Sequence, residues 1–422
     1  MSTTNSDPAT EATTVAAAAC PFSEADRANV VEWASKLDPM GDPLLADDPH
    51  PFYKQIREVC PVLWNDRFNF WMVTGYDEVF EVMRDVETFS NRQITVPAML
   101  EPAGPRIPLQ LDPPEHSKFR HILLRLFAPA AAKAMEPQTR AVAQRLLAGI
   151  RDRGECEFIR DFAIPLPFEI MLTWMGVPHE GWPLIMEAED SGIRLHASTP
   201  EARVRSVELK KQVNAYFEEV LLARQANPRP DAYDVISYLV RAEVEGRPLT
   251  LNEMLRICML LFAAGLHSTT STVGNMMVYL SQNPAARDRL VAEPALIPTA
   301  SEELMRWDSI GTFTRVALKD TVVGGQAIKA GDVLQLVTGA AGRDAKVFAA
   351  AEEVVLDRSP NLHLDFGVGP HRCLGSHIAR MELIVSLEEI HRIIPNYRPM
   401  SGRPVIRHAG SDRGTDQLWL QV

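Results

Sequence analysis

Apolar residues along this chain recur mainly at intervals of three and four, which is the spacing of one face of an α-helix. Prolines divide this pattern into separate helices, because a proline inside a helix removes a backbone hydrogen bond. The pattern predicts short helices from Asp48 and over 76–84, and longer ones over 115–240 with proline breaks, 252–280, 298–307 and 374–394. Asn252 is the predicted N-cap of the helix over 252–280.

Short runs of β-branched and aromatic residues lie between these helices. They predict a hairpin from 62–64 and 70–73, and strands over 314–318, 321–323 and 333–337. Residues 1–20 have the composition of a disordered tail, and no linker divides the remainder. We therefore expect a fold that is mainly α with a smaller β-rich portion, in a single domain over 21–422.

Composition and charge narrow the class of protein. The 422 residues are 46% hydrophobic and 23% charged, which is typical of a soluble globular protein, and the net charge of -12 disfavours nucleic acid as a partner. The five cysteines are scattered and odd in number, which excludes a disulfide framework or a zinc site and suits a reducing compartment. The longest apolar run, 257–266, is too short to span a membrane, so we expect a cytoplasmic protein with no membrane partner.

The segment 366–375 reads FGVGPHRCLG and carries the most specific chemistry of the chain. Gly369 allows a sharp backbone turn before Cys373, and Gly375 allows the next helix to approach a large flat group. Phe366 is placed to shield the loop from water. One interpretation is a metal-binding thiolate, and the other is a buried structural cysteine beside a glycine-rich turn.

This F-x-x-G-x-x-x-C-x-G segment resembles the haem-ligand signature of the cytochrome P450 family, in its soluble bacterial form. The resemblance extends over about 40–422 and implies the P450 fold, with haem (heme b) as cofactor and Cys373 as its axial thiolate ligand. It also implies a monooxygenase that activates O2 with two electrons and hydroxylates or O-demethylates an organic substrate. Around the haem it places Phe366, Gly367, Gly375, Ala264 and Gly265.

Two further sets of residues match the family. Glu303 and Arg306 form an E-x-x-R pair on one helix face, and the resemblance implies that Arg358 locks this pair in a buried, purely structural role. Four residues match family positions that neutralise the haem propionates: His116, Arg120, Arg315 and His371. Arginine suits that role because its planar guanidinium can bond a carboxylate at two points.

The segment FAAGLHSTT over 262–270 resembles the oxygen-activating A-G-x-[D/E]-T-T motif, with two departures. His267 stands where the acid is usual, and Ser268 stands where the threonine is usual. A proton relay through His267 and Ser268, shared with Thr269, is chemically feasible because imidazole titrates near neutral pH. The alternative is that His267 only borders a cavity. Because the usual acid and threonine are absent, a second possible function is that of a peroxide-driven or non-oxygenating P450 relative. A third possible function is that of a non-catalytic haem sensor.

The resemblance implies external electron donors, a ferredoxin and its NAD(P)H-dependent ferredoxin reductase. A basic patch is predicted to dock an acidic partner, with Arg125 and Arg380 as its main residues and these others beside them: Lys118, Arg120, His121 and Arg372. The substrate is expected to be a small-to-medium apolar organic molecule. Its contacts are predicted in 93–100, 193–196 and 310–313, at Leu261 and Ala264, and in the loop 409–413.

Overall fold

The computed structural model describes residues 23–39, 41–96, 98, 104–193, 200–229, 234–410 and 412–422. The longer α-helices in chain order are α1 (Glu24–Ala34), α3 (His50–Val59), α4 (Tyr76–Arg84), α5 (Glu115–Leu123), α6 (Pro129–Arg153), α7 (Pro165–Met175), α8 (Trp182–Ile193), α9 (Pro200–Ala226), α11 (Leu251–Gln282), α12 (Pro284–Ala292), α13 (Ile297–Trp307) and α15 (Ser376–Ile393). Three are short: α2 (Pro43–Asp47), α10 (Val235–Leu239) and α14 (Thr338–Ala341).

The strands form one larger sheet and several small ones. The five-stranded sheet has the order β1 (Val62–Asn65), β2 (Phe70–Val73), β10 (Val333–Val337), β7 (Thr312–Ala317) and β3 (Phe89–Ser90), and only β2 and β10 pair in parallel. The smaller sheets pair β11 (Arg398–Pro399), β14 (Trp419–Gln421) and β4 (Glu155–Glu157); β12 (Ile406–His408) and β13 (Gly414–Gln417); β5 (Glu243–Val244) and β6 (Arg247–Pro248); and β8 (Thr321–Val323) and β9 (Gln326–Ile328).

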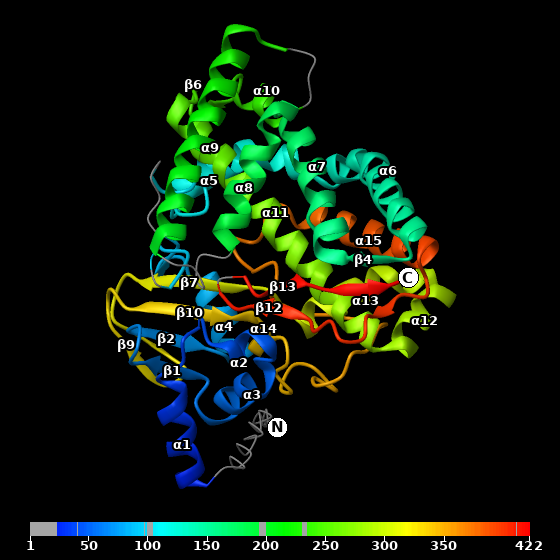
Figure 1. The fold of residues 1–422 in the computed structure, drawn as a ribbon. Helices are drawn as coiled ribbons and strands as arrows, with labels where there is room; N and C mark the ends of the chain where they lie inside the picture. Colours follow the sequence, from blue (N-terminus) through cyan, green and yellow to red (C-terminus); the bar gives the residue numbers. More distant parts are fainter. Residues whose placement is uncertain are drawn as a thin grey trace, which may run out of the picture.

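The helices and the main sheet occupy different parts of the molecule (Figure 1). The sheet and α1 to α4 lie below in this view, the helices α6 to α9 lie above, and α11 runs through the middle. One face of α11 contributes Phe262 to a core with α7 and α9, and its C-terminal half contributes Met277 to a second core with α6 and α15. The predicted fold class, mainly α with a smaller β-rich portion, is confirmed.

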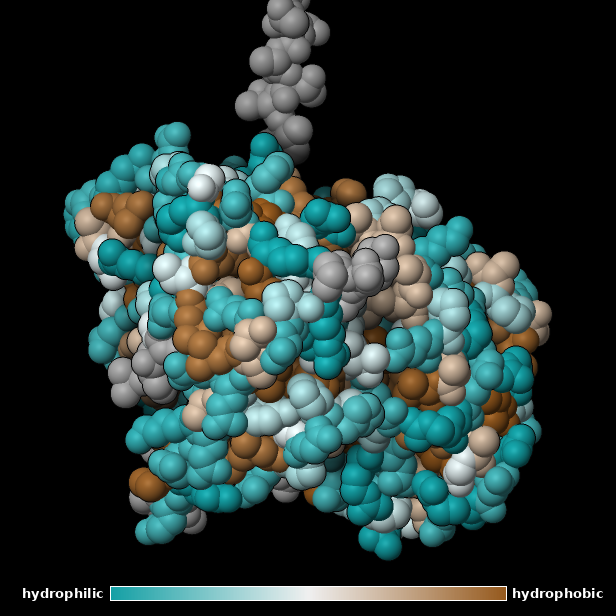
Figure 2. All heavy atoms as spheres, turned by 90° about the horizontal axis from the view of Figure 1, so that it is seen from above, coloured by the Kyte–Doolittle hydropathy of each residue, from teal (hydrophilic) through white to brown (hydrophobic). Residues whose placement is uncertain are grey.

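Helix α11 is both long and apolar. Among the described residues, α11 is the one helix whose length and composition would allow it to cross a membrane, but 67% of its most apolar window is buried inside the protein. Burial of that extent is what a core helix shows. On the face seen in Figure 2, polar residues surround scattered apolar ones.

Several predicted elements are confirmed, and a few need correction. The hairpin over 62–73 and the helix over 76–84 form as expected. Asn252 is not the N-cap of the long helix: Thr250 is, because its hydroxyl accepts from the N–H of Glu253 while the Glu253 carboxylate accepts from the N–H of Thr250. Strand β4 interrupts the predicted helical region over 115–240. The predicted tail over 1–20 lies outside the described residues.

Candidate active site

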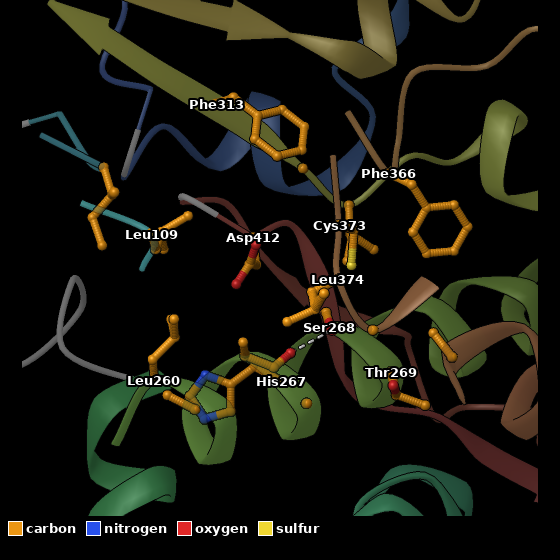
Figure 3. Close-up of a pocket in the computed structure, with 18 of the residues that line it drawn as sticks. Leu109, Leu260, His267, Ser268, Thr269, Phe313, Phe366, Cys373, Leu374 and Asp412 are labelled. Atoms are coloured by element: carbon orange, nitrogen blue, oxygen red, sulfur yellow. Dashed lines mark hydrogen bonds between the residues drawn. The ribbon is translucent and has the colours of Figure 1, made fainter. Parts of the chain in front are cut away.

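A cavity of about 490 Å³ lies between α11, α5, β7, the loop before α15 and the β12–β13 hairpin. Figure 3 shows its centre, with Cys373 on one side and Ser268 and His267 of α11 on another. Every residue predicted for the catalytic or cofactor-binding site lines this cavity except Gly367. Gly367 lies beside it with a positive φ of 62° and faces the ring of Phe313.

Local backbone bonds hold the loop that presents Cys373. The N–H of Cys373 donates to the carbonyl of Phe366 at 2.7 Å, and the N–H of Arg372 donates to that of Gly369 at 3.1 Å. Gly369 has a φ of 74°, and a Cβ there would lie 3.1 Å from the Met83 carbonyl, so both the turn and the close approach require glycine. The loop therefore fixes Cys373 with its sulfur open to the cavity (Figure 3).

The surroundings of Cys373 act on its pKa in opposite directions. Burial raises the pKa of the thiol. The backbone N–H of Gly375 and the guanidinium groups of Arg120, Arg372 and Arg380 lower it. A sulfur open to a cavity and surrounded by cations is suited to holding a bound metal as a thiolate, whereas a packed structural cysteine has no such opening.

The buried nitrogen atoms at this cavity without a hydrogen-bond partner among the described residues include Nδ1 of His116, Nε2 of His371 and Nε of Arg315. The two imidazoles lie 4.0 Å apart between ring centroids. Burial, with a smaller contribution from the neighbouring basic groups, lowers the pKa of His116 to about 4 and that of His371 to about 2. Unpaired buried polar atoms are costly, and the positive charges of Arg315 and Arg120 at this cluster favour an anionic ligand.

Arg120 completes this side of the cavity and also braces the cysteine loop. Its Nη2 donates to the carbonyl of Arg372 at 2.7 Å. His116 and Arg120 lie one turn apart on α5, as their spacing predicted, so one helix supplies two of the four basic groups.

The E-x-x-R pair is buried and locked as predicted. Glu303 accepts from Nε and Nη2 of Arg306, both at 2.8 Å, and from Nε of Arg358 at 2.9 Å. Glu303 and Arg306 are both 0% exposed. Arg306 also donates to the carbonyls of Gly342 and Ala351, which joins α13 to the segment that precedes the cysteine loop. The group lies outside the cavity lining, in keeping with a structural role.

The middle of α11 presents its small and hydroxylated residues to the cavity. The hydroxyl of Ser268 donates to the carbonyl of Ala264 at 2.7 Å, a bond drawn in Figure 3. Thr269 instead turns toward α15, where its hydroxyl bonds the carboxyl of Glu382 at 3.3 Å. A Cβ on Gly265 would collide with the Met171 methyl group of α7, so its small size also permits close packing of α7 against α11.

Two carboxyl groups at the cavity were not singled out from the sequence. Glu382 of α15 is buried, and burial raises its pKa to about 8. Asp412 lies in the β12–β13 loop, within the predicted substrate loop 409–413, and burial raises its pKa as well. Only tertiary structure brings either residue to the cavity, so helix periodicity gave no signal for them.

Comparisons with known proteins bear on this geometry. The cytochrome P450 family model matches residues 197–394. The chain is 33% identical over 389 residues to a probable cytochrome P450 127A1 of Sinorhizobium fredii, covering 90% of each chain. It is 30% identical to the steroid C26-monooxygenase of Mycobacterium tuberculosis, covering 84% of this chain and 88% of that one. The crystal structure of CYP101J2 superposes with a TM-score of 0.82 at 30% identity, covering 92% and 96% of the two chains.

The chain belongs to the cytochrome P450 family. It is a haem-thiolate monooxygenase, and its cofactor is haem, which P450 proteins bind through a cysteine thiolate. The residues that line the cavity of this P450 have the chemistry needed to bind a haem. The open sulfur of Cys373 could hold the iron, and the unpartnered nitrogen atoms of His116, His371 and Arg315 could bind the two carboxylates of a haem.

The predicted docking patch is only partly available to a partner. Arg380 bonds both carboxylate oxygens of Glu302, at 2.7 and 2.8 Å, and Lys118 lies 3.0 Å from both Glu115 and Glu245. Arg125 and Arg372 are exposed, and Arg125 lies over the ring of Tyr238. Arg380 is therefore poorly suited to docking, because an internal ion pair already occupies its guanidinium.

The predicted substrate contacts are mostly found at the cavity. Leu261, Ala264, Ile94 and Thr95 line it, as do residues 310–313. Residues 409, 410 and 412 of the last loop line it as well. Most of the predicted segment 193–196 lies outside the described residues.

Proposed function

We propose that this P450 hydroxylates or O-demethylates a small-to-medium apolar organic substrate, using O2 and two electrons that an NAD(P)H-dependent reductase passes to it through a ferredoxin. The observation that carries the proposal is the single cavity that Cys373, the α11 hydroxyl groups and apolar side chains share. Leu109, Leu260 and Phe313 supply apolar walls. The relative named steroid C26-monooxygenase supports a substrate of this apolar class. The cytoplasm is the proposed location.

We assign Cys373 as the axial ligand and the four basic residues as the propionate site. His116, His371 and Arg315 would each donate an unpaired N–H group to one of the two haem propionates. Arg120 would add a positive charge beside these propionates. Bound haem supplies the activation of O2, and the thiolate favours cleavage of the O–O bond. The protein chain contributes binding, exclusion of water and the supply of protons.

Ser268 and His267 are proposed to hold the protons that the reaction consumes. The Ser268 hydroxyl donates to the Ala264 carbonyl, so its oxygen keeps lone pairs that can accept a proton from the cavity side. His267 lines the same cavity one residue earlier on α11, and imidazole can exchange a proton near neutral pH. The Thr269 hydroxyl bonds Glu382, so it would take part only through that carboxyl.

Electron delivery is proposed to occur on the surface that bears Arg372 and Arg125. Both side chains are exposed, and Arg372 directly precedes Cys373. An acidic ferredoxin would be attracted to these cations, and such steering raises the rate of association. His121 of α5 is exposed on the same stretch of chain as Arg125.

A peroxide-driven enzyme remains the second candidate, because His267 and Ser268 replace the usual acid and threonine. The two candidates differ in their source of oxygen and electrons. Turnover with hydrogen peroxide alone is compared with turnover in the presence of NADH, ferredoxin reductase and ferredoxin. The leading proposal expects faster product formation from the ferredoxin system, and faster turnover with peroxide alone would favour the second candidate.

The decisive test is the difference spectrum of the reduced protein with carbon monoxide. Wild-type protein should give the red-shifted Soret band of a thiolate-ligated haem, and Cys373→Ala should lose it. Cys258→Ala serves as the matched control, because that cysteine is buried in α11 and does not line the cavity. An unchanged band in Cys373→Ala would refute the assignment of the axial ligand.

A further inference from the structure

The β12–β13 loop is fastened on both sides of Asp412. The N–H of Arg413 donates to the carbonyl of Ile310 at 2.7 Å, and Asp412 forms an isolated antiparallel bridge with Gly311. The Arg413 guanidinium bonds the buried carboxylate of Asp308 and donates to the carbonyl of Asp47 at 2.7 Å. The backbone at Asp412 is therefore held in place independently of the Asp412 side chain.

The Asp412 carboxylate projects into the cavity, close to both apolar side chains and basic groups. Figure 3 shows it between Phe313 and His267, on the side that also carries Leu109 and Leu260. Among the described residues, none forms a hydrogen bond or an ion pair with this carboxylate, although it is half-buried and burial raises its pKa. A buried polar group without a partner is unfavourable, so a ligand that bonds it gains affinity.

The charges around Asp412 limit what that ligand can be. His267, His408 and Arg106 are the basic groups that act on this carboxylate. His408 is already paired with Asp416 at 2.9 Å on the same hairpin, while the Arg106 guanidinium stays charged at all relevant pH values. A second cation would meet repulsion from Arg106, whereas a neutral hydroxyl group can donate to Asp412 without it.

We propose that Asp412 is a specificity-determining residue that accepts a hydrogen bond from a hydroxyl group on the substrate. The inference rests on the proposed function and refines its substrate class to an apolar alcohol. The hydroxyl end of the molecule is held at Asp412, and its hydrocarbon body lies against Leu109, Leu260 and Phe313. Asp412 is thus an orienting group and takes no part in bond breaking.

Binding of matched probe pairs to the ferric, haem-loaded enzyme tests the proposal. Cyclohexanol is compared with methylcyclohexane, and cyclododecanol with methylcyclododecane, because a methyl group replaces the hydroxyl at nearly constant size. Dissociation constants come from optical titration and from calorimetry. Wild-type enzyme should bind at least one alcohol roughly tenfold more tightly than its hydrocarbon, the gain expected from one hydrogen bond to a charged acceptor.

Two variants separate recognition from folding. Asp412→Leu should bring each alcohol and its hydrocarbon to equal affinity, while binding of the hydrocarbon persists and shows that the cavity is intact. Asp412→Asn keeps a carbonyl acceptor and should retain part of the preference. Wild-type enzyme that binds no alcohol better than its hydrocarbon overturns the proposal, and so does a preference that survives in Asp412→Leu.

A third probe tests the choice of a neutral donor. Tighter binding of protonated cyclododecylamine than of cyclododecanol, dependent on Asp412, would overturn the hydroxyl assignment in favour of a cationic substrate. Failure of the proposed function has a separate signature, since the carbon monoxide spectrum would then lack the thiolate band whatever the alcohols do.

Discussion

Glu382 gives this P450 a stability that should depend on pH in the slightly acidic to slightly alkaline range. Its carboxyl is 3% exposed, and burial raises its pKa from the ordinary 4.5 to about 8. Between these values the unfolded chain loses the proton and the folded protein keeps it, so stability falls as pH rises and levels off above about 8. Each pH unit in this window is worth about 1.36 kcal/mol, so two units give an upper value of about 2.7 kcal/mol.

The perturbation is Glu382→Gln, which keeps the size of the side chain and an oxygen for the Thr269 hydroxyl while removing the titration. We expect the free energy of unfolding of the variant, relative to wild type, to rise by about 2 kcal/mol between pH 6 and pH 8. Urea unfolding of the haem-loaded protein, followed by circular dichroism at several pH values, measures it. Glu218→Gln, at an exposed position of α9, is the control. A difference that stays constant with pH, or grows toward acid, would refute the reasoning.

Two further variants test the site and the fold. Ser268→Ala should lower the amount of product formed per NADH consumed and raise the release of hydrogen peroxide, with Ser268→Thr as a control that keeps the hydroxyl; unchanged coupling would remove Ser268 from the proton relay. Glu303→Ala should cost about 3–5 kcal/mol in the free energy of unfolding, because it leaves Arg306 and Arg358 buried without their carboxylate. A loss below about 1 kcal/mol in urea unfolding would show that the backbone carbonyls around Arg306 suffice.

The features that could be predicted from sequence are those that a few neighbouring residues determine. The loop before Cys373 has its turn encoded by Gly369, and His116 and Arg120 share a face because four residues separate them on one helix. The cap of α11 also has a local signal, since Thr250 and Glu253 have the spacing of a capping box, and the prediction of Asn252 as the cap was wrong.

The features that could not be predicted depend on contacts between distant parts of the chain. Strand β4 is three residues long and forms only because it pairs with β14, more than 250 residues later. The pKa of Glu382 depends on burial between α15 and α11. The loop 409–413 was predicted as a substrate contact, but the placement of Asp412 within it depends on the bond between Arg413 and Asp308. No local pattern of polar and apolar residues carries such information.

The fastening of the β12–β13 loop has a consequence for how this enzyme can change over generations of mutation. Residues that hold the loop, Arg413 and Asp308, differ from the residue that the loop presents to the cavity, Asp412. A mutation at position 412 therefore changes the chemistry offered to a ligand and leaves the scaffold fastened. Libraries randomised at that single position should yield mostly folded proteins with altered substrate preference, whereas libraries at position 413 should yield mostly unstable ones.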